Sequence, residues 1–300
     1  MATISIVISA FNAADCLVRT LASVGWADEI ILIDNESNDS TVEIAKRFKA
    51  KIFSKKNLVM LNVNKNFGFT KASSDWILSL DSDEEIPDSL AREIRNAIKT
   101  SDILGYWMPR KNIIFGKWIQ HGLWWPDKQL RLFRRGYGKF PCVHVHEYLT
   151  VDGKTGDLRA PFIHYNYSSI GQFLYKMDAI YTESEVQKLT STGYQVSWMD
   201  AVRFPVSDFV KIFFAQRGFK DGLHGLVLAL LQSFYLFIVF AKLWERAKFV
   251  DIELSLPLVT RELHERGKEL RYWTTTTEIE EESNPITRGW KRLVRKLYAS

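Results

Sequence analysis

Short apolar, β-branched runs alternate with segments of helical spacing over the first hundred residues, and this alternation constrains the fold more than any other feature. The predicted strands are residues 3–9, 29–34, 51–54 and 76–80, and the predicted helices are residues 13–24, 41–49, 66–73 and 88–99. Alternating strand and helix units predict an α/β fold with a mostly parallel sheet flanked by helices.

Polar side chains follow three of these strands, at the point where each strand ends. They are Ser9, Asp34, and the pair Asp81 and Asp83. Ligands of parallel α/β sheets bind beyond the carboxyl ends of the strands, so a site is expected there. Two carboxylates separated by one residue remain ionised at low cost only beside a cation, and hard oxygen ligands favour Mg²⁺ or Mn²⁺. A solvated acidic loop before the next helix is the structural alternative.

The pattern changes after residue 100, where strands of a mixed or antiparallel extension give way to helices. The later predicted elements are strands at 105–115 and 128–135, an alternating segment at 143–151, and helices at 168–189, 198–247 and 285–298. Breaks are expected near Pro205 and at 218–222. The predicted domains are a catalytic domain at 1–165 (a nucleotide half at 1–100 and an acceptor half at 101–165), a helical extension at 166–272 with an apolar helix at about 222–247, a linker at 273–284 and a basic helix at 285–300.

Four motifs of the first hundred residues point to one family. They are residues 6–12 (IVISAFN), 33–41 (IDNESNDST), 65–68 (KNFG) and 78–84 (LSLDSDE). In this order and spacing they resemble the family-2 glycosyltransferases of the GT-A (nucleotide-diphospho-sugar transferase) fold. Ala10 departs from the family pattern, which usually has Pro there, and this changes the shape of a turn. The sequence lacks the glycine motifs of P-loop and dinucleotide-binding proteins.

The resemblance implies that five of these residues bind the nucleotide of a UDP-sugar donor. Ser9 and Phe11 would line the uridine pocket, and Asp34 would hydrogen-bond the uracil. Lys65 would lie near the base or the diphosphate. Asp81 would contact the ribose side of the nucleotide.

The resemblance also implies a divalent cofactor, Mg²⁺ or Mn²⁺. Asp83 would ligate the ion, and Glu85 falls where some polyprenol-using relatives place another ligand. His164 is a further candidate that would approach the metal or the diphosphate.

A second polar cluster lies at residues 124–135 (WWPDKQLRLFRR) and 143–147 (VHVHE). It resembles bacterial transferases that extend the lipopolysaccharide inner core, including β-1,4-glucosyltransferases, and it carries the resemblance to about residue 250. Inverting transfer needs a base near the acceptor hydroxyl, and a carboxylate suits that role. Glu147 is the first candidate base and Asp127 the second, and His146 would orient the base or touch a phosphate. A surface ion pair with a nearby arginine is the alternative for Glu147.

Basic and aromatic residues are mixed between residues 109 and 140. This segment holds eight Lys or Arg and one acidic residue, and it includes Trp124 and Arg131. Aromatic rings stack on sugars and cations bind phosphate or carboxylate, so Trp124, Arg131 and His146 are predicted to bind an anionic acceptor. A solvated basic face over an aromatic core is the alternative. The net charge of +5 is only mildly basic, and no nucleic-acid partner is expected.

Residues 222–241 contain no Asp, Glu, Lys or Arg and would form a helix of about 30 Å, roughly the thickness of the bilayer core. This helix would span the bilayer, lie in one leaflet, or be buried in the protein. We favour a monotopic helix, because a span would put the basic tail across the membrane from the catalytic half. In the tail, Trp290, Leu293 and Leu297 share one face and basic residues the other, which suits an anionic lipid surface. Packing on the domain or on a partner is the alternative.

These observations predict a metal-dependent inverting glycosyltransferase. It would move a hexose, glucose by resemblance, from a UDP-sugar to a lipopolysaccharide core or another envelope glycolipid or glycan. The N-terminus predicts a strand and no signal peptide, so the expected location is cytoplasmic, peripheral or monotopic on the cytoplasmic face of the inner membrane. The alternatives are a polyprenyl-phosphate glycosyltransferase of the same fold and a non-catalytic membrane-surface adaptor with a relic nucleotide site.

Overall fold

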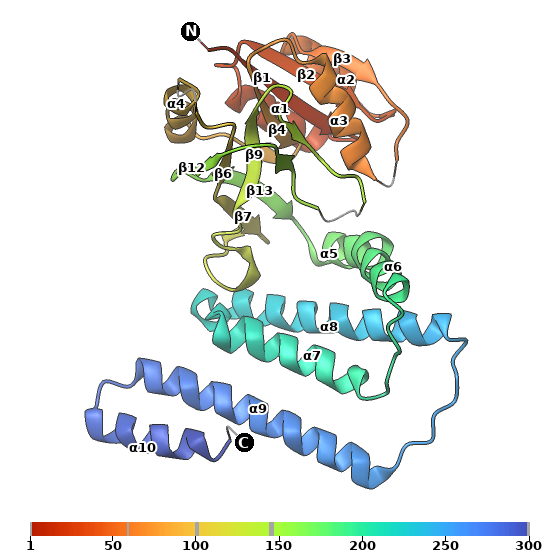
Figure 1. Cartoon of the computed structure of the whole chain (residues 1–300), viewed down its shortest axis with the longest axis vertical. Helices are drawn as coiled ribbons and strands as arrows, with labels where there is room; N and C mark the ends of the chain where they lie inside the picture. Colours follow the sequence, from red (N-terminus) through yellow and green to blue (C-terminus); the bar gives the residue numbers. More distant parts are fainter. Residues whose placement is uncertain (1, 59, 100–101, 144–146, 299–300) are drawn as a thin grey trace. The chain divides into compact units, whose positions relative to one another are not determined.

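The computed structural model describes residues 2–58, 60–99, 102–143 and 147–298 (Figure 1). The chain divides into two compact units. Met1–Trp118 and Trp124–Asn166 form the first, which we call the sheet unit. Ile119–Leu123 and Tyr167–Ser300 form the second, which we call the helical unit.

A seven-stranded sheet forms the centre of the sheet unit, in the order β12-β6-β9-β4-β1-β2-β3. Its strands are β1 (Ile4–Ala10), β2 (Glu29–Asp34), β3 (Lys51–Ser54), β4 (Trp76–Asp81), β6 (Gly105–Met108), β9 (Gln129–Arg134) and β12 (Thr155–Asp157). The first four are mutually parallel, and β9 runs antiparallel to both β4 and β6. The predicted α/β fold class, with a mostly parallel sheet and a helical C-terminal extension, is confirmed.

Four helices accompany the parallel strands: α1 (Ala14–Ser23), α2 (Thr41–Arg47), α3 (Leu61–Lys71) and α4 (Asp88–Ala97). Three of them match the predicted helices, but α3 begins five residues before the predicted start at 66. Its two faces are similar in polarity, so no periodic pattern of apolar residues marks its first turn. Gly68 of α3 lies so close to β1 that a Cβ there would stand 2.5 Å from a methyl of Val7, which explains the glycine in the KNFG motif.

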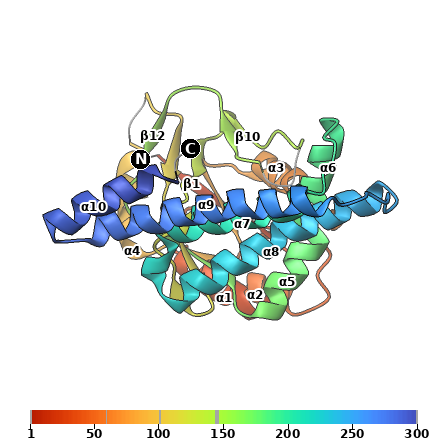
Figure 2. The ribbon, with the colours of Figure 1, turned by 90° about the horizontal axis from the view of Figure 1, so that it is seen from below.

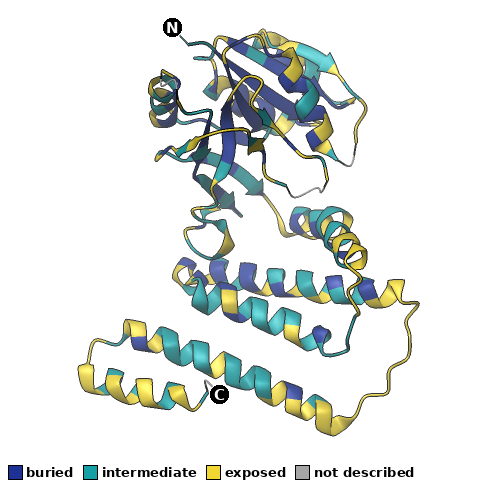
Figure 3. Cartoon of the chain, viewed as in Figure 1, coloured by how far each residue is buried: buried dark blue, intermediate teal, exposed yellow. Residues whose placement is uncertain are grey.

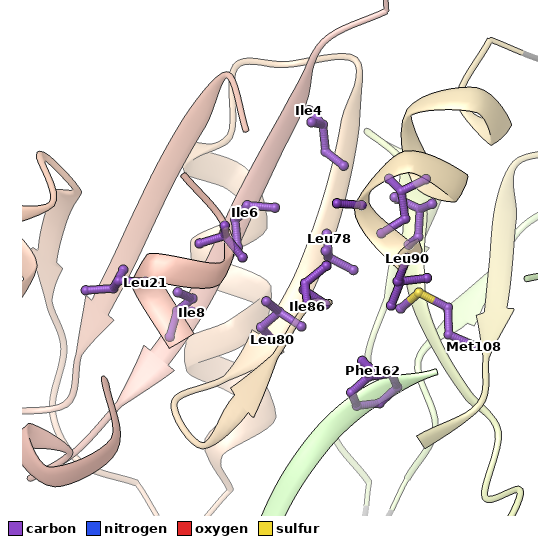
Figure 4. Close-up of a cluster of buried hydrophobic side chains, with 14 of the residues drawn as sticks. Ile4, Ile6, Ile8, Leu21, Leu78, Leu80, Ile86, Leu90, Met108 and Phe162 are labelled. Carbon is purple, nitrogen blue, oxygen red and sulfur yellow. The ribbon is translucent and has the colours of Figure 1, made fainter. Parts of the chain in front are cut away.

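The core lies on both faces of the sheet, as is usual for parallel strands. On one face Ile6 and Ile8 of β1 pack with Leu78, Leu90 and Phe162 (Figure 4). The pairing sets Ser9 beside Asp81 and Ala10 beside Asp34, so the polar strand ends meet at one edge of the sheet.

Two smaller sheets complete the sheet unit. One has the order β5-β13-β7-β8, with β5 (Glu84–Glu85), β13 (Phe162–Tyr167), β7 (Arg110–Ile114) and β8 (Lys117–Trp118); the other pairs β10 (Gly138–Lys139) with β11 (Thr150–Val151). The single strand predicted at 105–115 is wrong, because Pro109 has no N–H for a ladder and the chain divides there into β6 and β7. In the alternating segment at 143–151, only Thr150–Val151 is a strand among the described residues.

The helical unit consists mainly of α-helices (Figure 2). The helices are α5 (Ile170–Lys176), α6 (Glu183–Ser191), α7 (Asp200–Val210), α8 (Leu223–Arg246), α9 (Leu256–Glu281) and α10 (Pro285–Lys296). The π segments are Met177–Thr182 and Lys211–Ala215, and Gly218–Asp221 is a 3₁₀ turn. A second 3₁₀ turn, Gly122–Trp124, lies where the chain returns to the sheet unit. The break predicted at 218–222 is present, but the break predicted at Pro205 is wrong: α7 continues through this proline and packs on α8.

The linker predicted at 273–284 is also wrong over most of its length. Helix α9 runs to Glu281, and only three residues separate it from α10. The hydroxyls of Thr274, Thr276 and Thr277 each donate to the carbonyl four residues earlier, which accommodates the threonine run inside the helix. Asn284 caps α10 by accepting from the amides of Ile286 and Thr287, and α10 packs along α9.

Among the described residues, α8 is the one helix long and apolar enough to cross a membrane. Five large apolar side chains stay exposed along it: Leu223, Leu230, Phe234, Phe237 and Trp244. Their spacing puts them within one face of the helix. Ile286, Trp290, Leu293 and Leu297 likewise form an exposed stripe on α10, where most of the helix surface is exposed (Figure 3).

Candidate active site

Three predicted nucleotide-binding residues lie at the carboxyl ends of β1 and β2. The Ser9 hydroxyl accepts a hydrogen bond from the Asn35 amide at 2.9 Å. The buried Asp34 carboxylate accepts from the backbone N–H of Ser37 at 3.2 Å. Phe11 follows β1 with 45% of its surface exposed, so its ring is available to a ligand.

A polar cavity of about 300 Å³ in the sheet unit collects five other predicted site residues. They are Lys65, Asp81, Asp127, Arg131 and Glu147. Further lining residues that the sequence did not single out are Asn62, Arg110, Gln129, Leu130, Phe140, Tyr148 and Leu149. The cavity therefore joins residues assigned to the nucleotide with residues assigned to the acceptor, whereas Ser9, Phe11 and Asp34 are not among its lining.

Asp81 is held between two cations at one wall of the cavity. Its Oδ1 lies 2.5 Å from Lys65 Nζ, and its Oδ2 accepts from Arg131 Nη2 at 2.8 Å. Burial alone would raise the pKa of Asp81, but the charges of Lys65 and Arg131 outweigh it and hold that pKa well below its usual range. Asp81 thus remains a carboxylate, with its counter-charge supplied by the protein.

Arg131, which the sequence analysis predicts to bind the acceptor, is buried beside Asp81. It is only 6% exposed, and its Nη2 also donates to Glu84 at 3.1 Å. Burial raises the pKa of the fully buried Glu84, with Arg131 opposing and Asp81 adding to the rise. No sequence motif marked Glu84 as the partner, because the contact depends on β9 and β5 coming together in space.

Asp83 lies beside His164. Strand β13 runs beside β5, with His164 in register with Glu84, and this brings His164 Nε2 to 3.7 Å from Asp83 Oδ2. One ion with bonds of about 2.1 Å would reach both atoms. Glu85 accepts a hydrogen bond from the Tyr165 hydroxyl at 2.9 Å.

The described residues contain no group of three His, Cys, Asp or Glu side chains arranged for a metal. A carboxylate and an imidazole nevertheless fit an ion that takes its other ligands from phosphate and water. Mg²⁺ is usually bound in this way, through one or two carboxylates and substrate phosphates.

The two candidate bases are both held by several donors. Glu147 accepts from the backbone amides of Cys142 and Val143 at 2.5 and 2.9 Å and from the Asn62 amide at 3.2 Å. These bonds hold the Glu147 carboxylate against the backbone of residues 142 and 143 and against α3. His146, assigned to the acceptor, lies outside the described residues.

Asp127 is anchored from three sides. Its Oδ2 accepts from Arg110 Nε at 2.7 Å and from the Asn112 amide at 2.9 Å, and its Oδ1 accepts from Gln129. Trp124, also assigned to the acceptor, contributes its backbone carbonyl to the same Asn112 amide.

Comparisons with known proteins relate part of this chain to a known family. Residues 5–149 match the model of glycosyl transferase family 2. An uncharacterized glycosyltransferase of Rickettsia typhi is 29% identical over 260 residues, covering 82% of this chain and 88% of the relative. The lipopolysaccharide core biosynthesis glycosyltransferase LpsC of Rhizobium meliloti is 22% identical over 250 residues, covering 81% and 92%. A crystal structure of S. aureus TarS 1–349 in complex with UDP resembles this chain at 13% identity and a TM-score of 0.46, covering 80% and 91%. By the match to the family model, residues 5–149 form a glycosyl transferase family 2 domain, as the sequence motifs predict.

Proposed function

We propose that this glycosyltransferase moves a hexose, glucose by resemblance, from a UDP-sugar to a lipopolysaccharide-core or related anionic envelope acceptor. The proposal rests on one cavity, which Lys65 and Asp81 line together with both candidate bases. A transferase needs donor and acceptor in one space, and this cavity supports that arrangement. The match to LpsC, whose name assigns it to lipopolysaccharide core biosynthesis, supports the acceptor class.

The donor half of the proposal places uridine at the ends of β1 and β2. Phe11 would stack on the base, and Asp34 would accept a hydrogen bond from the uracil. Asp81, held in its charged form, would accept from the ribose hydroxyls. Lys65 would lie beside the diphosphate, whose charge it partly balances.

Asp83 and His164 would hold the divalent ion, Mg²⁺ or Mn²⁺. When bound, such an ion stabilises the charge of a leaving diphosphate. Asp83 would supply a carboxylate oxygen, and His164 would supply the ring nitrogen Nε2, which lies 3.7 Å from Asp83 Oδ2. Glu85 is not assigned to this ion; its Oε2 accepts from the Tyr165 hydroxyl.

The transfer itself is proposed as a single inverting displacement. The acceptor hydroxyl oxygen attacks the anomeric carbon, the bond from that carbon to the diphosphate oxygen breaks, and UDP leaves with the bonding electron pair. Glu147 takes the hydroxyl proton. We favour Glu147 over Asp127, because Glu147 is held by neutral amides whereas Asp127 Oδ2 is paired with the Arg110 guanidinium.

The helical unit is proposed to bind the cytoplasmic face of the inner membrane. The exposed apolar faces of α8 and α10 would enter one leaflet, and Arg292 and Lys296 beside the α10 stripe would meet anionic headgroups. Because α8 also packs on α7, we propose a helix that lies in the interface and does not span it.

Calorimetry of UDP binding tests the donor half. We expect the wild-type protein to bind UDP with Mn²⁺ present, and Asp83→Ala to abolish the metal-dependent part of the binding. The matched control is Asp102→Ala, which removes a carboxylate from the exposed ion pair with Lys154 and should bind as the wild type does. Wild-type protein that binds no UDP in the presence of Mn²⁺ would contradict the proposal and favour the non-catalytic adaptor.

A further inference from the structure

A buried amide joins the acceptor side of the cavity to the proposed metal side. Asn112 lies on β7, next to β13 in the four-stranded sheet, and its residue is 0% exposed. Its Nδ2 donates to the Trp124 carbonyl and to Asp127 Oδ2, both at 2.9 Å. Its Oδ1 lies 2.7 Å from His164 Nδ1. No motif singles out this residue, and the mechanism proposed above does not use it.

The chemistry of its partners determines which way this amide points. A backbone carbonyl and a carboxylate can only accept hydrogen bonds, so the two Nδ2 hydrogens must face Trp124 and Asp127. The amide oxygen is therefore the atom that faces His164. Since an amide oxygen can only accept, Nδ1 of His164 must carry a proton.

This hydrogen bond determines the tautomer of the neutral imidazole. With the proton on Nδ1, the ring has its lone pair on Nε2. Nε2 is the atom that lies 3.7 Å from Asp83 Oδ2. The lone pair is thus on the nitrogen next to the carboxylate that would bind the metal.

We propose that Asn112 is a positioning residue that holds His164 in the Nδ1–H tautomer and so presents Nε2 to the divalent ion beside Asp83. This inference rests on the proposed function, which places the ion at Asp83 and His164. Metal-binding histidines usually donate their second ring N–H to a carboxylate, carbonyl or water, and such partners typically matter 10–100-fold for metal affinity. Here the amide oxygen of Asn112 accepts this hydrogen bond, and its Nδ2 donates to Asp127.

The first test reads the tautomer directly in the metal-free protein. Ring-¹⁵N histidine labelling distinguishes protonated from unprotonated ring nitrogens by NMR, and His164→Gln assigns the His164 signals. At a pH where the ring is neutral, we expect the Nδ1–H form in the wild type. Asn112→Leu, which has no acceptor, should shift His164 toward the Nε2–H form that free histidine favours.

The matched control is Asn64→Leu. Asn64 is also a buried amide, and it donates to Asn35 Oδ1 and to the Lys56 carbonyl. We expect this variant to keep the wild-type tautomer of His164. An unchanged His164 spectrum in Asn112→Leu, or an equal change in Asn64→Leu, would overturn the proposal.

The second test measures Mn²⁺ affinity by electron paramagnetic resonance with UDP at saturation. We expect Asn112→Leu to weaken Mn²⁺ binding by about 10–100-fold. Adding it to His164→Gln should cause no further loss, because both changes act through one imidazole. Wild-type protein that fails to bind Mn²⁺ contradicts the proposed function itself. Wild-type binding that Asn112→Leu leaves unchanged contradicts only the role of Asn112.

Discussion

Glu29, at the start of β2, illustrates how a single carboxylate stabilises the sheet unit. It accepts hydrogen bonds from the Ser5 hydroxyl, from the Ser73 amide and hydroxyl at 2.9 and 3.0 Å, and from Lys51 at 2.6 Å. Burial alone would raise the pKa of Glu29, but the bonds from Lys51, Ser5 and Ser73 outweigh it and lower the pKa from 4.5 to about 2. The charged form is therefore favoured in the folded state.

Because the folded pKa lies below the unfolded one, Glu29 stabilises the protein fully above about pH 4.5 and loses this effect as the pH falls toward 2. We predict that Glu29→Gln lowers the free energy of unfolding at pH 7 by about 1–3 kcal/mol. The difference from wild type should shrink at pH 3. Urea unfolding at both pH values measures this, and an equal difference at pH 3 and pH 7 would contradict it.

The two candidate bases make a second prediction for single residues. Glu147→Gln should lower kcat by about 10²–10⁴-fold, the usual contribution of a general base, while UDP binding is retained. Asp127→Asn should reduce activity less, because Asp127 is the carboxylate paired with Arg110. Steady-state kinetics of both variants decide the assignment. The reverse order would make Asp127 the base, and full activity of Glu147→Gln would favour a polyprenyl-phosphate acceptor, which is already anionic.

Among the elements, the start of α8 depends on a close backbone contact. A Cβ at Gly225 would stand 1.8 Å from the carbonyl oxygen of Gly218, and backbone cannot move aside as a side chain can. Gly267 on α9 has no atom within 4 Å of its Cβ position. We predict that Gly225→Ala lowers the thermal unfolding temperature, whereas Gly267→Ala raises stability by about 0.5–1 kcal/mol through helix propensity. Circular dichroism melting compares the two, and a Gly225→Ala protein as stable as Gly267→Ala would contradict the packing described.

Some of the strands and helices could be predicted from the sequence and others could not. Apolar runs such as β1 and β4 were predictable because buried parallel strands need apolar residues on both faces. Helix α9 was missed at its threonine run because the hydroxyl-to-carbonyl bonds that accommodate Thr274 and Thr276 form only inside a helix. The continuation of α7 through Pro205 likewise depends on packing that no local pattern reports.

Part of the candidate site could likewise be predicted from the sequence, and part could not. Asp81 and Asp83 were found because two carboxylates after a strand form a recognisable motif. Their different partners could not be predicted, since Arg131 and His164 reach them from strands 50 and 81 residues later in the chain. Asn112 carried no signal at all, because one asparagine in a strand is common and its three partners are distant in sequence.

At the scale of the whole molecule, membrane binding is the property to test. We predict that the protein floats with vesicles that contain anionic lipid and much less with neutral vesicles. Phe234→Glu on the exposed face of α8 and deletion of residues 285–300 should each reduce the bound fraction, and added salt should reduce it further. Vesicle flotation measures all of these. Unchanged binding after the deletion would contradict a role of α10 in membrane binding. Unchanged binding of Phe234→Glu would contradict a role of the exposed α8 face.

We propose above that the chain transfers a hexose from a UDP-sugar with inversion. The most direct measurement incubates the wild-type protein, Mn²⁺ and a lipopolysaccharide-core acceptor with a panel of labelled UDP-sugars, and then determines the anomeric configuration of the product. We predict transfer from one UDP-hexose, with the configuration inverted and with no product when the metal is chelated. Transfer from none of the donors, or a product that retains the donor's configuration, would contradict it.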